Sequence, residues 1–378
     1  MLPFTSIDFY ILLGVLILGV QLLKPIYSRF ISYSNLLFAI TLFYVLFFFT
    51  RHLQLIGFAI YSYLIYYIFS FKFKNPHRLW VSLLLALPMI LLKVQLNISW
   101  LNFAGLSYIT FRTIQIFIDR QPDEKPVHPR DYFSFLVFTP TLLIGPIDRW
   151  QRFKNNLEEG YRNLNSNLFA EGWQNIALGV LQKYVMAEIV TRYWLQPEDN
   201  VHSFLQHINA AFAYTAYLYF DFAGYSSLAV GFGNMLGIKV PHNFNHPYLA
   251  VNPQDFWRRW HITLGDWLRD YFFRPIYKWL SGFYSLKKYP LTKQNLSLFF
   301  TFALMGCWNG LQHNYIWSGS IFGLYSVIHN TYLIECKKKD NDILFGKLNP
   351  KWVQLISTLV MICAAVFAIY VFSGRSGI

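Results

Sequence analysis

The sequence predicts an all-α polytopic membrane protein, and three observations support this fold class. Only 13% of the 378 residues are charged, about half the share of an average soluble domain, whereas 55% are apolar and 20% are aromatic. Apolar runs recur from residue 8 to residue 373. No polar stretch between them is long enough to fold separately, so residues 1–378 are expected to form a single integral membrane domain.

Each apolar run of about twenty residues is expected to be a transmembrane helix, because this length crosses the hydrocarbon core. The first run has no Lys or Arg ahead of it, which fits a retained helix better than a cleavable signal peptide. The roughly eleven expected runs are 8–23, 32–50, 53–71, 79–97, 99–118, 132–146, 168–193, 204–235, 295–313, 314–335 and 353–373.

The basic residues predict which side of the membrane each connection faces. Lys and Arg gather in the first, third and fifth connections, near residues 24–29, 72–78 and 120–130, whereas the second and fourth offer only Arg51 and Lys93. Because cytoplasmic loops carry the excess of basic residues, the N-terminus is expected outside a multi-pass protein of the cytoplasmic membrane.

Two stretches, 147–167 and 239–293, are too polar to cross lipid as helices. Irregular backbone at membrane depth survives only where protein buries it or water reaches it. We therefore expect re-entrant or interfacial helices there, around an internal cavity.

The net charge of +13, from 32 Lys and Arg against 19 Asp and Glu, fits anionic lipid headgroups or an acidic partner better than nucleic acid. The three cysteines have neither CxxC nor CxxxC spacing, and the chain has no HExxH, P-loop or GxSxG motif. These patterns predict no metal site, and they give no support to an NTPase or a serine hydrolase.

The densest polar motif is FWRRWHITLGDWLRDY at 256–271. An interfacial amphipathic helix would explain its Trp and Arg residues, but it explains His261 and Asp270 less well. Ionisable residues at membrane depth are functional candidates, and a neutral imidazole is the commonest general base near pH 7. His261 is therefore a candidate base, with Arg259, Trp260 and Asp270 around it.

Asp221 is an acid within an apolar run, in YFDFAGYS at 219–226. It is expected to be paired, protonated or facing a cavity, and a polar clamp between helices is the structural alternative to a substrate contact. The glycines at 231, 233 and 237 do not match a dinucleotide-binding motif and predict close helix packing instead.

Two further motifs place polar residues at the ends of apolar runs. GPIDRWQR at 145–152 leaves an Asp-Arg pair at the membrane boundary, where a surface ion pair alone would matter little. GCWNGLQH at 306–313, with a histidine beyond it, indicates either a polar cavity lining or hydrogen bonds between helices. The residues concerned are Asp148, Arg149, Arg152, Trp308, Asn309, Gln312, His313 and His329.

In this order the motifs resemble those of the membrane-bound O-acyltransferase family. The resemblance rests on NFNHPYLAVNPQDFWRRWHITLGDWLRDYFF at 243–273, preceded by YFDFAGYS, and similar blocks extend from about residue 105 to residue 330. GLSYITFR at 105–112 and FTPTLLIGPIDRWQRF at 138–153 are most similar to members that transfer D-alanyl groups to lipoteichoic acid. The resemblance implies a ring of tilted helices around a central funnel or tunnel, which Asn243 would help to line.

The resemblance also implies substrates and partners. On the cytosolic side, a carrier protein would supply D-alanine as a phosphopantetheine thioester, with no other cofactor bound. Outside, an acceptor hydroxyl of a cell-wall polymer such as teichoic acid would receive it, directly or through an acyl-relay protein. The alternative within the family is O-acetyl transfer to another extracellular polysaccharide.

One position departs from the family pattern. The family has a second histidine in a W-H-G block, at the position usually called catalytic, and here this block reads Trp308-Asn309-Gly310. An amide cannot take a proton from an alcohol near pH 7. Three explanations stay open: the chain is an inactive or altered form, His313 substitutes, or Asn309 orients the acyl carbonyl while His261 acts as base.

Two functions outside acyl transfer compete with it. A transporter would also hold ionisable residues in the membrane, but it would predict repeats in corresponding halves, and the sequence has none. A catalytically impaired scaffold, or a receptor for an acyl carrier, is consistent with Asn309.

Overall fold

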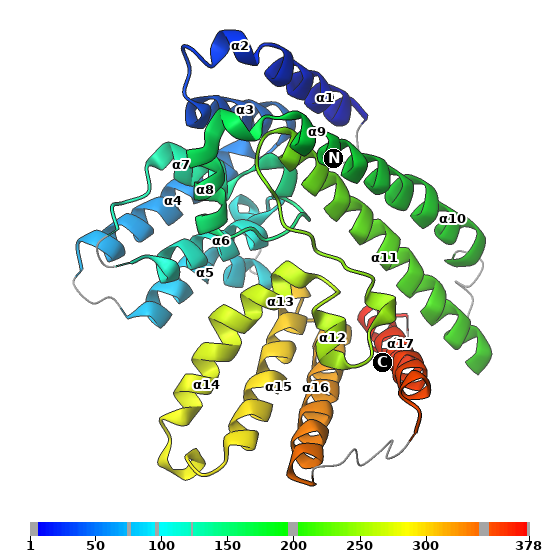
Figure 1. Ribbon diagram of the computed structural model, residues 1–378. Coiled ribbons are helices and arrows are strands. Elements are labelled where there is room, and N and C mark those ends of the chain that lie inside the picture. Colours follow the sequence, from blue (N-terminus) through cyan, green and yellow to red (C-terminus); the bar gives the residue numbers. More distant parts are fainter. Residues whose placement is uncertain are drawn as a thin grey trace. The chain divides into compact units, whose positions relative to one another are not determined.

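The computed structural model describes residues 7–73, 77–94, 98–121, 124–195, 203–339 and 348–375. Within these residues every regular element is a helix and none is a β-strand, as expected for an all-α protein (Figure 1). Contacts divide the chain into two compact units, 1–180 with 224–241 and 181–223 with 242–378, and each is described by itself. The expected single domain over 1–378 stays a prediction.

Most of the described long helices overlap the expected apolar runs. Two of the described helices, α4 and α17, are long and apolar enough to cross a membrane by length and composition, and α1 and α3 contain shorter apolar helices. The first unit holds α1 (Ile7–Leu22), α2 (Lys24–Tyr27), α3 (Tyr33–Phe48), α4 (His52–Phe71), α5 (Arg78–Lys93), α6 (Leu106–Asp119), α7 (Pro129–Leu136), α8 (Trp150–Glu159) and α9 (Ser166–Val180). The second unit holds α10 (Ala187–Val190), α12 (Pro253–Trp257), α13 (Ile262–Leu268), α14 (Arg274–Ser281), α15 (Pro290–Asn309), α16 (His313–Lys339) and α17 (Pro350–Phe372), and α11 (Phe204–Met235) contributes to both units.

The prediction of one helix over 132–146 is wrong. α7 ends at Leu136, and after a single 3-10 turn at Thr139–Thr141 the chain runs on without a helix to Arg149. Proline supplies no backbone N–H and cannot continue a helix, and Pro140 and Pro146 lie within this stretch. The segment 137–149 is nevertheless almost entirely buried, so its backbone polar groups need partners inside the protein.

The region 147–167 holds α8, of ten residues. In the region 239–293, α12 has five residues, but α13, a π-helical turn at Arg269–Phe273 and α14 follow one another without a break, so this stretch is longer in helix than expected. Its expected re-entrant or interfacial position stays a prediction. The expected helix over 168–193 is observed, because α9, a π-helical turn at Leu181–Met186, α10 and a second π-helical turn at Thr191–Leu195 follow one another without a break.

Glycines bring two helices of the first unit into close contact, as the sequence predicts. A Cβ atom on Gly231 of α11 would lie 2.6 Å from the carbonyl oxygen of Gly172 on α9, and one on Gly172 would lie 2.9 Å from that of Gly231. Only glycine permits this approach, which is typical of membrane helices.

Candidate functional site

His261 lies at the bend between α12 and α13, outside the long helices, and it caps α13. Its carbonyl oxygen accepts hydrogen bonds from the N–H groups of Leu264 and Gly265, each at 3.1 Å. The residue is 5% exposed, and its Nε2 has no hydrogen-bond partner among the described residues. A buried, unpaired ring nitrogen needs an explanation, and proton transfer is one.

Aromatic rings surround this imidazole. The ring of Phe222, on α11, meets it edge-on, with centroids 4.7 Å apart and an interplanar angle of 85°. The ring of Trp308, near the end of α15, lies 6.3 Å away. Burial among these rings lowers the pKa of His261, so the imidazole is neutral near pH 7 and is a weaker base than an exposed histidine.

Asn309 follows Trp308 and ends α15 at the protein surface. Its Nδ2 donates to the carbonyl oxygen of Met305 at 3.1 Å. The contact between the rings of Trp308 and His261 thus places the C-terminal end of α15 near the imidazole. His313 and Gln312 are exposed at the start of α16, and the structure gives neither residue a contact with His261.

Glycines also fix the end of α15 against α16. A Cβ on Gly306 would collide with the carbonyl oxygen of Tyr315, and one on Gly319 would collide with that of Phe302. Because Gly306 lies one helical turn before Asn309, this close packing determines where Trp308 and Asn309 lie. Figure 1 shows α14, α15 and α16 side by side in this unit.

The other candidates from the motif at 256–271 contact other residues than His261 does. Trp260 is buried and stacks on Phe256, with centroids 5.6 Å apart. Arg259 pairs with Asp255 at 2.9 Å. Asp270 lies between Arg269 and Arg274, at 3.1 and 3.0 Å. Their expected contacts with a substrate stay predictions.

Asp221 pairs with Lys183, at 2.5 Å, as a clamp between α11 and the π-helical turn at 181–186. Sequence reasoning missed Lys183, although a lysine within an apolar run is a signal of the same kind as Asp221. The other candidate histidine, His329, is half-buried on α16 beside the Tyr332 ring, with centroids 6.3 Å apart.

The Asp-Arg group belongs to the first unit. Asp148 is 3% exposed, and its Oδ1 accepts from the N–H of Arg149 at 2.8 Å and pairs with Arg152 at 3.1 Å. Sequence reasoning treated this group as a boundary ion pair and missed its buried partners on α6. Gln115 donates to the Asp148 carbonyl oxygen at 2.6 Å. Burial raises the pKa of the Asp148 carboxyl, and the charges of Arg152 and Arg112 offset only part of this rise.

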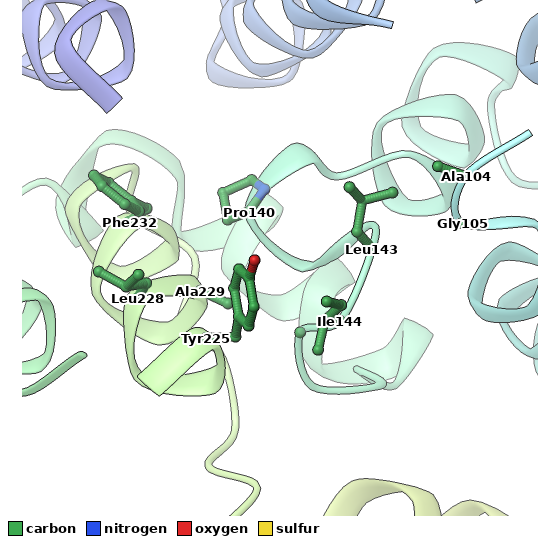
Figure 2. A pocket seen from close by; sticks show the side chains of 10 residues that line it. Ala104, Gly105, Pro140, Leu143, Ile144, Tyr225, Leu228, Ala229 and Phe232 are labelled. Carbon is green, nitrogen blue, oxygen red and sulfur yellow. The ribbon is translucent and has the colours of Figure 1, made fainter. Parts of the chain in front are cut away.

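An apolar pocket of about 220 Å³ lies in the first unit. Figure 2 shows side chains of α11 and of the segment after Pro140 facing one another across it. Its walls carry no acidic or basic residue, so it does not resemble a catalytic centre. The lining residues are Ala104, Gly105, Pro140, Leu143, Ile144, Gly145, Tyr225, Leu228, Ala229 and Phe232. In the part of the chain that the structure describes, no group of three or more His, Cys, Asp or Glu could hold a metal ion.

His261, with the rings of Phe222 and Trp308 beside it, is the candidate site of this helical protein. The chain belongs to the membrane-bound O-acyltransferase family, whose model matches residues 64–373. Members of this family are membrane proteins and acyltransferases.

Curated relatives fall into two groups. Teichoic acid D-alanyltransferases from Bacillus subtilis and Streptococcus thermophilus are each 30% identical over 99% and 98% of this chain, and the alignments cover 98% and 95% of those proteins. A peptidoglycan O-acetyltransferase from Helicobacter pylori is 32% identical over 74% of the chain, but the alignment covers only 54% of that protein.

Proposed function

We propose that this acyltransferase moves a D-alanyl group from a carrier-protein phosphopantetheine thioester to a hydroxyl of a teichoic acid or a similar extracytoplasmic polymer. One observation carries the choice of substrate. The chain aligns over nearly its whole length with teichoic acid D-alanyltransferases, whereas it spans about half of the peptidoglycan O-acetyltransferase.

In the proposed reaction the acceptor oxygen attacks the thioester carbonyl while Nε2 of His261 takes the hydroxyl proton. The C–S bond then breaks, and the phosphopantetheine sulfur leaves with that proton. Asn309 cannot serve as the base, because its amide nitrogen carries no usable lone pair. Its N–H can donate to the carbonyl oxygen, which becomes negative as the bond forms.

A donor comparison tests the substrate. Purified protein in liposomes would receive carrier protein loaded with radiolabelled D-alanine or, separately, with acetate, and label in lipoteichoic acid would be counted. We expect transfer of D-alanine well above that of acetate. Preferential transfer of acetate would support the second candidate, an O-acetyltransferase, which the Helicobacter relative favours.

The asparagine at the W-N-G block motivates a third candidate, a scaffold with impaired catalysis. Asn309→His tests it in the same assay. A rise in transfer from near zero would identify the natural chain as impaired. Equal transfer by both forms would remove Asn309 from the chemistry.

We infer a multi-pass topology with the N-terminus outside, supported by the basic connections near 24–29 and 120–130. In a chain whose three cysteines are replaced by serine, His52→Cys should react with an impermeant thiol reagent in intact cells, and Lys125→Cys should react only after lysis. Equal labelling from outside would contradict this topology.

Basic residues offer a surface for an acidic carrier protein. Near α14 the exposed candidates are Lys278, Lys287, Lys288 and Arg274, while Arg149, Arg152 and Lys154 are candidates in the first unit. Lys293 is a further basic residue beyond α14, but it is 8% exposed, with its Nζ 5.5 Å from the Tyr277 ring centroid, so it is too buried to contact a carrier protein. Changing Lys287 and Lys288 together to Glu should weaken carrier binding in neutral detergent, where anionic lipid is absent. Unchanged binding would assign these lysines to the lipid surface instead.

A further inference from the structure

The backbone of His261 is held in an unfavourable conformation. Its φ of 45° and ψ of 50° lie in the left-handed region, which among the described non-glycine residues only His246 shares. A side chain makes this region unfavourable, and such residues persist where their surroundings over-determine them. Contacts close to His261 must therefore impose this backbone conformation.

Residues 243–245 form backbone hydrogen bonds with the chain on both sides of His261, and we call this set of hydrogen bonds the bracket. On the N-terminal side, the N–H of Asn245 donates to the carbonyl oxygen of Arg259 at 2.9 Å. On the C-terminal side, the N–H of Ile262 donates to the carbonyl oxygen of Asn243, also at 2.9 Å. The chain from 259 to 262 thus has little freedom to rotate.

The side chain of Asn243 adds two hydrogen bonds to this bracket. Its Oδ1 accepts from the backbone N–H of Thr263 at 3.3 Å and from the Thr263 hydroxyl at 2.6 Å. Asn243 is 1% exposed, so water does not compete for these bonds. Asn243 therefore accepts three hydrogen bonds from the two residues that follow His261.

The imidazole itself makes no hydrogen bond to the described residues, and its ring contacts are with Phe222 and Trp308. In many enzymes a hydrogen bond to the second ring nitrogen sets the orientation of a histidine. Here the orientation depends on the backbone and on aromatic packing. The contacts that fix the backbone of His261 therefore also fix the direction of its Nε2 atom.

We propose that Asn243 is a positioning residue that holds His261 in the left-handed conformation and keeps its imidazole in the enclosure of Phe222 and Trp308. The role in catalysis rests on the proposed function, in which His261 is the base. This role differs from the funnel lining that the family resemblance implies for Asn243. The positioning itself can be measured without turnover.

Accessibility of the His261 ring is the direct test. The purified full-length protein in detergent would be treated with diethyl pyrocarbonate, and the modified histidines would be identified by peptide mass spectrometry. Asn243→Ala should raise the labelling rate of His261 by about tenfold, because two buried hydrogen bonds are lost. Asn245→Ala is the matched control and should leave the rate unchanged, since only the backbone of Asn245 takes part in the bracket.

Milder variants cover the case in which Asn243→Ala fails to fold. Thr263→Val removes one donor and should also raise His261 labelling, whereas Thr263→Ser keeps the hydroxyl and should not. In an active preparation, Asn243→Ala should lower kcat at nearly constant KM for the carrier protein. Protection of His261 in both Asn243→Ala and Thr263→Val would overturn the proposal. Absence of turnover alone would count against the proposed function and leave the labelling result intact.

Discussion

Two buried groups, one in each unit, differ in how their polar atoms are satisfied. Arg112 is 1% exposed, and its guanidinium makes four hydrogen bonds, to the carbonyl oxygens of Phe135, Leu136 and Thr141 and to the Thr141 hydroxyl. His261 is 5% exposed, and its ring has no hydrogen bond to the described residues. The Arg112 side chain therefore stabilises the fold through four hydrogen bonds, although its Nε has no partner among the described residues, whereas the Nε2 of His261 is the atom that the proposed reaction uses.

Arg112 donates hydrogen bonds to the non-helical segment 137–149. Irregular backbone in an apolar protein needs internal hydrogen-bond donors, and one guanidinium supplies several in a fixed geometry. The comparison predicts that changes in the first unit act on stability, whereas changes at His261 act on chemistry.

Arg112→Met should have the largest effect on stability, a loss of about 3–5 kcal/mol, because three carbonyl oxygens and Asp148 lose a buried partner. Thermal melting in detergent would measure it. Arg112→Lys, which keeps the charge and loses the forked geometry, should recover only part of the loss. A melting temperature within a degree of the original would refute the contrast with His261.

The pH dependence of stability should report Asp148, which lies outside the long helices. Burial raises the pKa of its carboxyl to about 6, although Arg152 and Arg112 lower it. The folded protein therefore binds this proton more tightly than the unfolded chain, and the contribution to stability is complete below about pH 4 and lost as the pH rises through 6. The loss should be on the order of 3 kcal/mol. Melting curves of Asp148→Asn should lack this step, and an identical step in the variant would contradict the assignment.

The Lys183–Asp221 pair should have an intermediate effect, because its side chains are 13% and 26% exposed. Lys183→Met should cost about 1–2 kcal/mol, less than the loss of a partner in a fully buried pair, because both side chains keep part of their surface exposed. Exchanging the two charges, Lys183→Asp with Asp221→Lys, should restore part of the melting temperature. Additive losses in the exchanged protein would show that the two residues do not act as a pair.

The smallest effect is expected at Arg269, whose side chain is 52% exposed between Asp266 and Asp270. Arg269→Gln should cost less than about 1 kcal/mol, because solvent screens exposed ion pairs. A loss as large as that of Arg112→Met would show that exposure does not separate these groups.

Most long helices could be predicted from the sequence, because about twenty apolar residues have few other solutions in a membrane. Apolarity alone predicts a helix over 132–146, whereas Pro140 and Pro146 argue against it and α7 ends at Leu136. The π-helical turns beside α10 leave no signal in the apolar pattern, since they depend on packing.

The candidate site was only partly predictable. His261 stands out as an ionisable residue in an aromatic motif, and Asn309 stands out against the family pattern. The contact between Phe222 and His261 joins residues far apart in the chain, and the bracket from Asn243 depends on a left-handed backbone. Both arise from tertiary structure, so a linear pattern does not contain them.

The most direct test of the account is the transfer rate of His261→Gln in liposomes with D-alanyl carrier protein, measured beside its melting temperature. We predict a loss of roughly 10²–10⁴-fold in rate, the usual worth of a general base, with a melting temperature close to that of the unchanged protein. Transfer at an undiminished rate by His261→Gln would contradict the assignment of His261 as the base.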